Sequence, residues 1–344
     1  MSSLQWLFSN QIKYSKLFQK VSSSGFTLIE LLVAIVLAAL IITPLLGFMV
    51  NVLDADRREQ AKTSSEQEIQ NAFDYINRDL QQAVYIYDAD GLTRNSNPTT
   101  PSSSGIKDQI PPASETSGTS TVGCSNSSLC QPILVFWKRK YLRDVIEFSG
   151  GTGTDTKDDT FVYSLVAYYI IKDNNTTWSK AARIARFEVS DGIQVSNGQT
   201  CTGYSDTTYL AKTGGGAWCP DKGFKRFNLS ETVGELKDKM NTWTKASSNY
   251  SENALVLIDF IDQTAIGSSL PTCPSGSGML VSGSFMGFYA CINSNNRNST
   301  AQIFIRGNAL ARVQNNDLDY SKSQKSYFPT ASIRVQGRGY LFNK

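Results

Sequence analysis

Histidine is absent from all 344 residues of the chain. This absence excludes Ser-His-Asp and Cys-His nucleophile systems, histidine-ligated zinc and the commonest general base. Catalysis by Asp, Glu, Lys or Tyr survives it, but nothing in the sequence groups those residues into a recognisable site. We therefore expect a protein that is not an enzyme, with no catalytic residue, no cofactor and no bound metal.

Cysteine is scarce, and no Cys-x-x-Cys pair is present. The six cysteines form three successive pairs in Ser-, Gly- or Asn-rich sequence: Cys124 and Cys130, Cys201 and Cys219, and Cys273 and Cys291. Many connectivities are open, and sequence alone does not choose among them. We favour sequential pairing, since each bridge would close one local loop; free thiols and a metal site are the alternatives. Disulfides would place this part of the chain outside the cytoplasm.

Acidic residues are missing from residues 1–25, which contain Lys13, Lys16 and Lys20. Because three of the 33 basic residues and none of the 30 acidic residues lie there, the rest of the chain is formally neutral. A global field that attracts nucleic acid is therefore not expected, although local patches remain open.

One long apolar run is present, from Phe26 to Val52, and Glu30 is its only acidic residue. As a helix it would be about 40 Å long, enough to span a hydrocarbon core of about 30 Å. The preceding lysines predict a cytoplasmic N-terminus with the bulk of the chain on the far side of the membrane. A carboxylate within a membrane costs about 2.5–3.5 kcal/mol, so we expect Glu30 to have a function. A membrane helix with a snorkelling acid is the alternative.

The stretch "SGFTLIELLV" resembles the prepilin cleavage and methylation motif of type IV pilins and type II secretion pseudopilins. This resemblance implies that a prepilin peptidase removes residues 1–25 by cutting after Gly25 and N-methylates Phe26. It also implies that Glu30, the fifth mature residue, meets the N-terminal amine of a neighbouring subunit during assembly. An ordinary signal peptide is disfavoured, because its cleavage site follows the apolar region. Pro44 and Gly47 weaken one turn of the helix and are expected either to loosen it on assembly or to form a passive kink.

Beyond the apolar run, apolar residues recur at a helical period, which predicts that the helix continues as an amphipathic segment through residues 53–91. We expect its last turn to reach Tyr87 and Gly91 to stop it. The positions are Ile69, Phe73, Ile76, Leu80, Ala83, Val84 and Tyr87. Residues 92–131 are rich in Ser, Thr, Pro and Gly and predict an irregular connection. Residues 132–344 carry short β-type runs between turns and predict an antiparallel sheet. One later helix is expected in "SETVGELKDKMNTW", with Ser230 as its N-cap. The expected fold is α+β and pilin-like, a long N-terminal helix packed on a β-rich globular head.

Two patterns in the head are candidates for binding. The stretch "WKRKYLR" contains four cationic residues, Lys138, Arg139, Lys140 and Arg143. They would contact an anionic polysaccharide, nucleic acid or a partner subunit. The alternative is a solvated hairpin turn between two strands. The stretch "DTKDDT", residues 155–160, lacks the spacing of an EF-hand and is interpreted as an acidic turn, although some pseudopilin heads bind calcium.

The resemblance covers few residues of the head but is specific at the N-terminus. The chain is similar to the larger minor pilins and pseudopilins, and residues 41–91 are similar to pseudopilins of cyanobacterial hormogonium polysaccharide secretion. The family implies partners, namely prepilin peptidase, other pilin subunits, an inner-membrane assembly platform and membrane lipid before assembly. We expect a minor pseudopilin that supports polysaccharide secretion and gliding motility from the inner membrane and then a filament. A minor pilin for DNA uptake or adhesion is the alternative, and an exported enzyme on a pilin anchor is disfavoured by the missing histidine.

Overall fold

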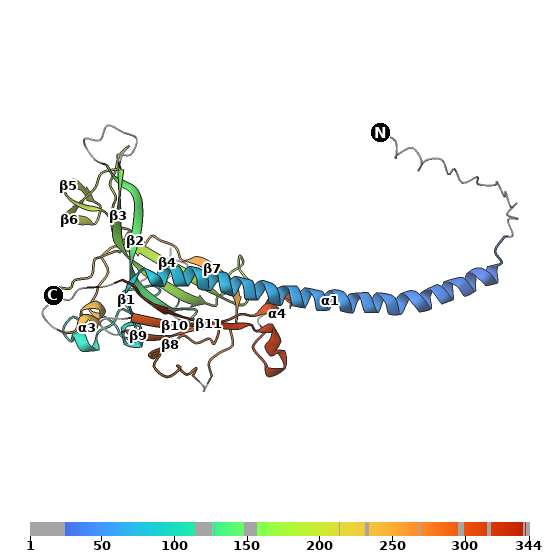
Figure 1. Ribbon diagram of the computed structural model, residues 1–344. Helices are drawn as coiled ribbons and strands as arrows, with labels where there is room; N and C mark the ends of the chain where they lie inside the picture. Colours follow the sequence, from blue (N-terminus) through green and yellow to red (C-terminus); the bar gives the residue numbers. More distant parts are fainter. Residues whose placement is uncertain are drawn as a thin grey trace, which may run out of the picture. The chain divides into compact units, whose positions relative to one another are not determined.

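The computed structural model describes residues 25–113, 126, 128–147, 157–212, 214–230, 234–267, 270–294, 299–314, 318–339 and 341. By internal contacts the chain divides into two units, Met1–Ala55 and Asp56–Lys344. The first unit contains the N-terminal part of helix α1, and the second unit contains the rest of that helix and both large sheets. Figure 1 labels the elements.

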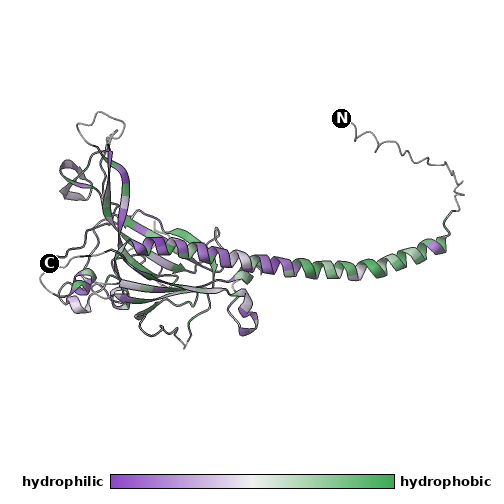
Figure 2. Cartoon of the chain, in the orientation of Figure 1, coloured by the Kyte–Doolittle hydropathy of each residue, from purple (hydrophilic) through white to green (hydrophobic). Residues whose placement is uncertain are grey.

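Helix α1 spans Leu28–Gln81 and changes in character along its length (Figure 1). Its N-terminal half is predominantly hydrophobic and its C-terminal half mostly hydrophilic, as Figure 2 shows. In the second unit one face of the helix is buried, at Ala61, Ser65, Ile69, Ala72, Phe73, Ile76, Asp79 and Leu80. This spacing of three and four residues is the amphipathic period that the sequence predicts, so the long helix is confirmed.

The predicted continuation of α1 to Tyr87 and to a stop at Gly91 is wrong. The helix ends at Gln81, and strand β1 follows at Ala83–Ile86. All four residues of "AVYI" are buried, and β1 pairs with a long neighbouring strand, which places Tyr85 opposite Trp137. A β-branched and aromatic run buried on both faces is better satisfied as a paired strand than as a half-exposed helix. Gly91 lies inside the short helix α2, Ala89–Thr93.

The larger sheet has five strands in the order β1-β2-β3-β4-β7, and all its pairs are antiparallel. Its other members are β2 Cys130–Glu147, β3 Lys157–Ile171, β4 Ala182–Ser190 and β7 Leu255–Ile261. Strand β2 is longer than the short runs that the sequence predicts, and it has an irregularity between Leu142 and Ile146. The alternative of a hairpin turn at "WKRKYLR" is wrong, because β2 pairs with β3 from Trp137 to Leu142.

The second sheet has four strands in the order β11-β10-β9-β8, and a two-stranded sheet pairs β5 with β6. The bounds are β5 Gln194–Cys201, β6 Tyr204–Tyr209, β8 Met279–Ser282, β9 Phe288–Ser294, β10 Ser299–Arg306 and β11 Thr330–Gln336. The pairs in these sheets are also antiparallel. The predicted α+β class, a long helix followed by an antiparallel β-rich head, is therefore confirmed.

One hydrophobic core joins the C-terminal part of α1 to both large sheets. Its largest fully buried side chains include Trp137, Tyr168 and Phe187 from the five-stranded sheet and Phe288 from the four-stranded sheet. Burial of such aromatic side chains contributes the largest share of apolar stabilisation. This core holds residues 56–81 of α1 to the sheets.

The remaining helices are short: α3 Leu236–Asn241, α4 Ala309–Gln314, and the 3-10 helices η1 Pro101–Ser103 and η2 Lys322–Tyr327. The predicted N-cap of α3 at Ser230 is wrong. The cap is Glu235, whose N–H donates to Asp238 Oδ2 at 3.0 Å. Gly234 precedes it with φ +86°, a left-handed conformation that an α-helix cannot contain, so the helix begins later than predicted.

Candidate functional site

The predicted cleavage junction lies immediately before α1. A Cβ atom added to Gly25 would meet nothing within 4 Å, and the side chain of Phe26 is 82% exposed. Within the part of the chain that the structure describes, the junction is therefore open to an enzyme.

Glu30 occupies the third position of α1 and forms a reciprocal cap with Thr27. The Thr27 N–H and hydroxyl donate to Glu30 Oε2 at 3.3 and 3.2 Å, and the Glu30 N–H donates to Thr27 Oγ1 at 3.3 Å. This is a capping box, which satisfies backbone donors that the first turn of a helix leaves without partners. The signal Thr-x-x-Glu before an apolar run was available in the sequence, and our prediction missed it.

The apolar side chains of α1 between Leu28 and Leu53 are exposed on all sides of the helix. The helix is long and apolar enough to cross a membrane, by length and composition. A helix that is hydrophobic all round needs apolar surroundings, either lipid or neighbouring helices. This segment therefore fits membrane anchoring.

The turn that carries Pro44 and Gly47 is helical in the structure. The Thr43 hydroxyl donates to the Ala39 carbonyl oxygen at 2.7 Å, and a Cβ atom on Gly47 would meet nothing within 4 Å. Neither residue is required by packing within the described part of this chain. Their predicted role in loosening the helix remains a prediction.

A buried ion network connects α1 to the five-stranded sheet. Asp79, on α1, accepts hydrogen bonds from Lys138 Nζ, Tyr168 Oη and Arg186 Nε, each at 2.7 Å. Arg186 also donates to Glu188 at 2.6 Å, and Lys138 Nζ lies 3.5 Å from the same carboxylate. Four sheet residues and one helix residue thus form a single cluster with little access to water.

This network sets the protonation of its members. Burial alone would raise the pKa of Asp79, but the hydrogen bond and charge of Arg186, with the charge of Lys138, hold it below its usual value. Burial likewise opposes ionisation of Glu188, and the charges of Arg186, Lys138 and Lys140 hold its pKa low. Both carboxylates are therefore ionised at neutral pH.

The structure separates the four members of the predicted cationic patch. Lys138 is buried in the ion network, which corrects its expected place on an exposed patch. Lys140 is partly exposed and donates to Ser190 Oγ at 2.8 Å. Arg143 is exposed, with its Nε 3.2 Å from Asp144 Oδ2, and Arg139 is exposed with its guanidinium 4.4 Å from the ring centroid of Phe161. Alternation along β2 explains the split, because neighbouring residues face opposite sides of the sheet.

Two of the three predicted disulfides are confirmed, Cys201–Cys219 and Cys273–Cys291. Cys130 is also disulfide-bonded, and its predicted partner Cys124 lies outside the described residues. The predicted acidic turn is not found in the part that can be seen, because Lys157 to Thr160 belong to β3. Residues 155 and 156 lie outside the described part.

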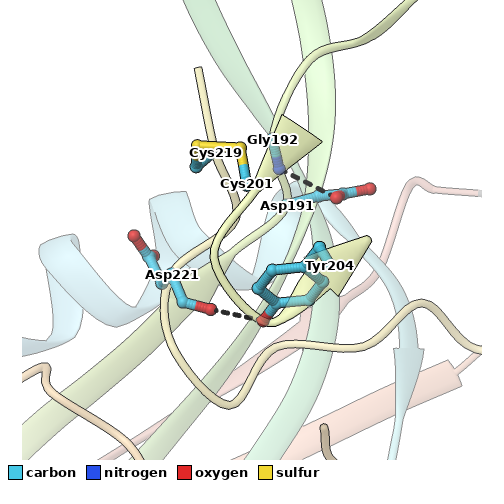
Figure 3. Close-up of a disulfide and its surroundings, with 6 residues drawn as sticks. All are labelled: Asp191, Gly192, Cys201, Tyr204, Cys219 and Asp221. Atoms are coloured by element: carbon cyan, nitrogen blue, oxygen red, sulfur yellow. Dashed lines mark hydrogen bonds between the residues drawn. A yellow bond between two sulfur atoms is a disulfide. The ribbon is translucent and has the colours of Figure 1, made fainter. Parts of the chain in front are cut away.

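Figure 3 shows the surroundings of the Cys201–Cys219 bridge. The Tyr204 hydroxyl lies 2.9 Å from the carbonyl oxygen of Asp221, and burial raises the pKa of Tyr204 to about 12. The Gly192 N–H donates to Asp191 Oδ1 at 2.8 Å. Burial raises the pKa of Asp191 even though Arg226 pairs with it. The bridge and the Tyr204 contact hold the two strands β5 and β6, the β5–β6 module, to the segment that contains Cys219 and Asp221.

The arrangement as a whole is that of an α+β protein with a type IV pilin-like signal ahead of an apolar helix. Residues 21–46 match a family model described as the prokaryotic N-terminal methylation motif. That match supports a pilin-like or pseudopilin-like protein, and it implies processing by prepilin peptidase and assembly with other pilins. Comparison with curated proteins and with solved structures found no match.

Proposed function

We propose that the chain is a minor pseudopilin, an assembly subunit of a type IV pilus or a type II secretion-like system, which supports polysaccharide secretion and gliding motility. The observation that carries the proposal is the position of Glu30 in the first turn of an apolar helix, as the fifth residue after the cleavage junction. Before assembly the helix lies in membrane lipid. After assembly it packs with the helices of neighbouring subunits.

Glu30 then acts as the residue that sets the register between subunits. Cleavage after Gly25 creates a charged amine on Phe26, and that amine enters an apolar surrounding where an unpaired charge is costly. The Glu30 carboxylate of a neighbouring subunit provides its partner. A paired charge at this depth specifies position more than it adds stability.

The secretion of polysaccharide rests on the resemblance of residues 41–91 to pseudopilins of hormogonium polysaccharide secretion, such as HpsC. The formal neutrality of residues 26–344 supports this function over DNA uptake, because non-specific DNA binding depends on excess positive charge. We also propose that the protein has no enzymatic activity.

The test replaces Glu30 with Leu in cells that carry an active prepilin peptidase. Membrane-bound protein should remain abundant, because removing the charge makes insertion easier. Crosslinking to filament partners should fall by several hundred-fold, since an uncompensated buried amine costs about 3–5 kcal/mol. The matched control is Glu59→Gln, on an exposed position of the same helix. Crosslinking of Glu30→Leu at the wild-type level would contradict the assembly role.

Deletion of the whole chain tests the secretion role separately. Exported polysaccharide and gliding should both decrease, whereas uptake of labelled DNA should not change. Loss of DNA uptake with normal polysaccharide export would assign the chain to the alternative function.

A further inference from the structure

Strands β2 and β3 carry an exposed pair of aromatic side chains. Tyr141, on β2, and Phe161, on β3, lie directly opposite each other in the antiparallel register. Their ring centroids are 5.3 Å apart, and their side chains are 49% and 52% exposed. Two adjacent, half-exposed aromatic rings on one sheet face form an apolar patch that another molecule can cover.

The pair is the outer end of an aromatic row that begins in the core. On the same face, buried Trp137 contacts Phe227 at 5.0 Å between centroids, and Phe227 contacts Tyr163 at 5.0 Å. Tyr163 lies opposite Arg139, one pair along the face from Tyr141 and Phe161. The exposed rings are therefore supported by a packed sheet and lose little conformational entropy on binding.

A hydrogen bond also fixes the Tyr141 side chain. The Tyr141 hydroxyl donates to Asp159, which raises the pKa of Tyr141 and lowers that of Asp159. Asp159 also accepts from the Asp144 N–H at 2.9 Å. Asp144 has φ +53°, a strained conformation for a residue other than glycine, within the irregularity of β2. Such irregularities redirect side chains and occur beside functional sites.

 Asp144 also lines a pocket on this part of the surface. The pocket that Asp144 lines has a volume of about 300 Å³. Lys157, Lys212 and Trp218 also line it, and Lys212 Nζ lies 4.6 Å from the centroid of a Trp218 ring. A second cation–aromatic pair thus lies next to Asp144.

Both cations and carboxylates surround these rings: Asp159 accepts from Tyr141, and Asp144 pairs with Arg143. Arg139 stacks on Phe161, and no carboxylate of the described residues pairs with Arg139 or with Lys212. Arg139 and Lys212 are thus the cations that a ligand on this surface could pair with. A carboxylate-bearing ligand would therefore gain ionic partners in addition to contact with the rings.

We infer that Tyr141, Phe161 and Arg139, with the adjoining pocket at Lys212 and Trp218, bind an acidic polysaccharide chain. The apolar C–H faces of sugar rings pack on aromatic rings, and the arginine and lysine side chains pair with uronate carboxylates. This inference rests on the proposed secretion function and assigns it a contact surface on the head.

The test titrates the full-length protein, in detergent micelles, into end-labelled oligogalacturonate and follows fluorescence anisotropy. Wild-type protein should bind, and binding should weaken with added salt. The double variant Tyr141→Ala/Phe161→Ala should bind at least about tenfold more weakly, as expected for loss of central aromatic contacts. Arg139→Ala should also weaken binding, whereas the conservative Phe161→Tyr should retain it.

The matched control is Trp178→Ala, which removes another exposed aromatic side chain, 40% exposed, from the loop between β3 and β4. It should bind like wild type, and near-ultraviolet circular dichroism should show that every variant remains folded. The inference is overturned if wild-type protein does not bind, if neutral dextran binds equally well, or if the double variant binds like wild type.

A cellular measurement separates this inference from the proposed function. If deletion of the chain abolishes export but the folded double variant binds oligogalacturonate normally, only the inference fails. If deletion leaves export unchanged, the proposed function fails, whatever the binding result. Loss of crosslinking to pilin partners in the double variant, with normal oligogalacturonate binding, would assign the rings to a subunit interface instead.

Discussion

The N–H and the hydroxyl of Thr27 both donate to one carboxylate oxygen of Glu30, at 3.3 and 3.2 Å. The residue expected to pair with a neighbouring subunit therefore already has a partner within its own chain. An isolated carboxylate in an apolar environment is costly, and local hydrogen bonds reduce that cost. Glu30 thus stabilises the start of α1 before any second subunit is present.

Replacing Thr27 with Ala should destabilise the first turn of α1 by about 1 kcal/mol, because the N-cap oxygen is lost. Thr27→Ser keeps that oxygen and should behave like wild type. Hydrogen exchange at the amides of residues 28–31, in detergent micelles, measures the difference. Equal protection in the Ala and Ser variants would show that the cap does not stabilise the helix.

Replacing Asp79 with Asn should destabilise the second unit by about 3 kcal/mol, because the buried cations Arg186 and Lys138 would then share only the carboxylate of Glu188. Glu59→Gln, at an exposed ion pair of the same helix, should cost less than about 1 kcal/mol. Chemical unfolding followed by near-ultraviolet circular dichroism gives both values. A similar loss in the two variants would contradict the structural role of the network.

Stability should decrease in acid through Asp79 and Glu188. Their pKa values are lower in the folded protein than in the unfolded chain, where they are about 4. Their contribution is fully present above that pH and is lost as pH falls through the lower, folded values. Asp191 and Asp221 have raised pKa values and act in the opposite direction.

Unfolding measured as a function of pH checks this expectation. In Asp79→Asn the acid-dependent loss should be smaller than in wild type, because the carboxyl group of residue 79 no longer titrates. An identical pH dependence in the two proteins would show that Asp79 does not contribute to it.

Non-reduced peptide mapping should find the bridges Cys201–Cys219 and Cys273–Cys291, together with the predicted Cys124–Cys130 bridge. Replacing both Cys201 and Cys219 with Ser should destabilise the β5–β6 module by about 3 kcal/mol, as expected for a loop of this size. Limited proteolysis of residues 194–219 measures that loss. A crosslink between different pairs would contradict sequential pairing.

The sequence predicts the elements that have a strong local pattern. The apolar run, the amphipathic period from Ile69 to Leu80 and most long strands are found where expected. Strand β1 was assigned to the helix, because "AVYI" continues a helical spacing and only its pairing with β2 decides otherwise. The β5–β6 pair was missed because its strands are polar and exposed, so they lack alternation.

The candidate sites also divide into those with a local sequence pattern and those formed by tertiary contacts. Gly25, Phe26 and Glu30 lie within a contiguous motif and could be identified from the sequence alone. The exposed pair Tyr141–Phe161 depends on register between two strands, and the burial of Lys138 depends on Asp79, 59 residues away in the sequence. Relationships of this kind arise from tertiary pairing and leave no local signal.

The three side chains that donate to Asp79 also fix the rotation of α1 about its own axis. One residue corresponds to about 100° of rotation, so a helix turned by that angle would direct the carboxylate away from all of its partners. The network therefore determines which side chains of residues 56–81 face outward. A neighbouring subunit would meet the same helical surface on every copy of the chain, which a filament built from repeated contacts requires.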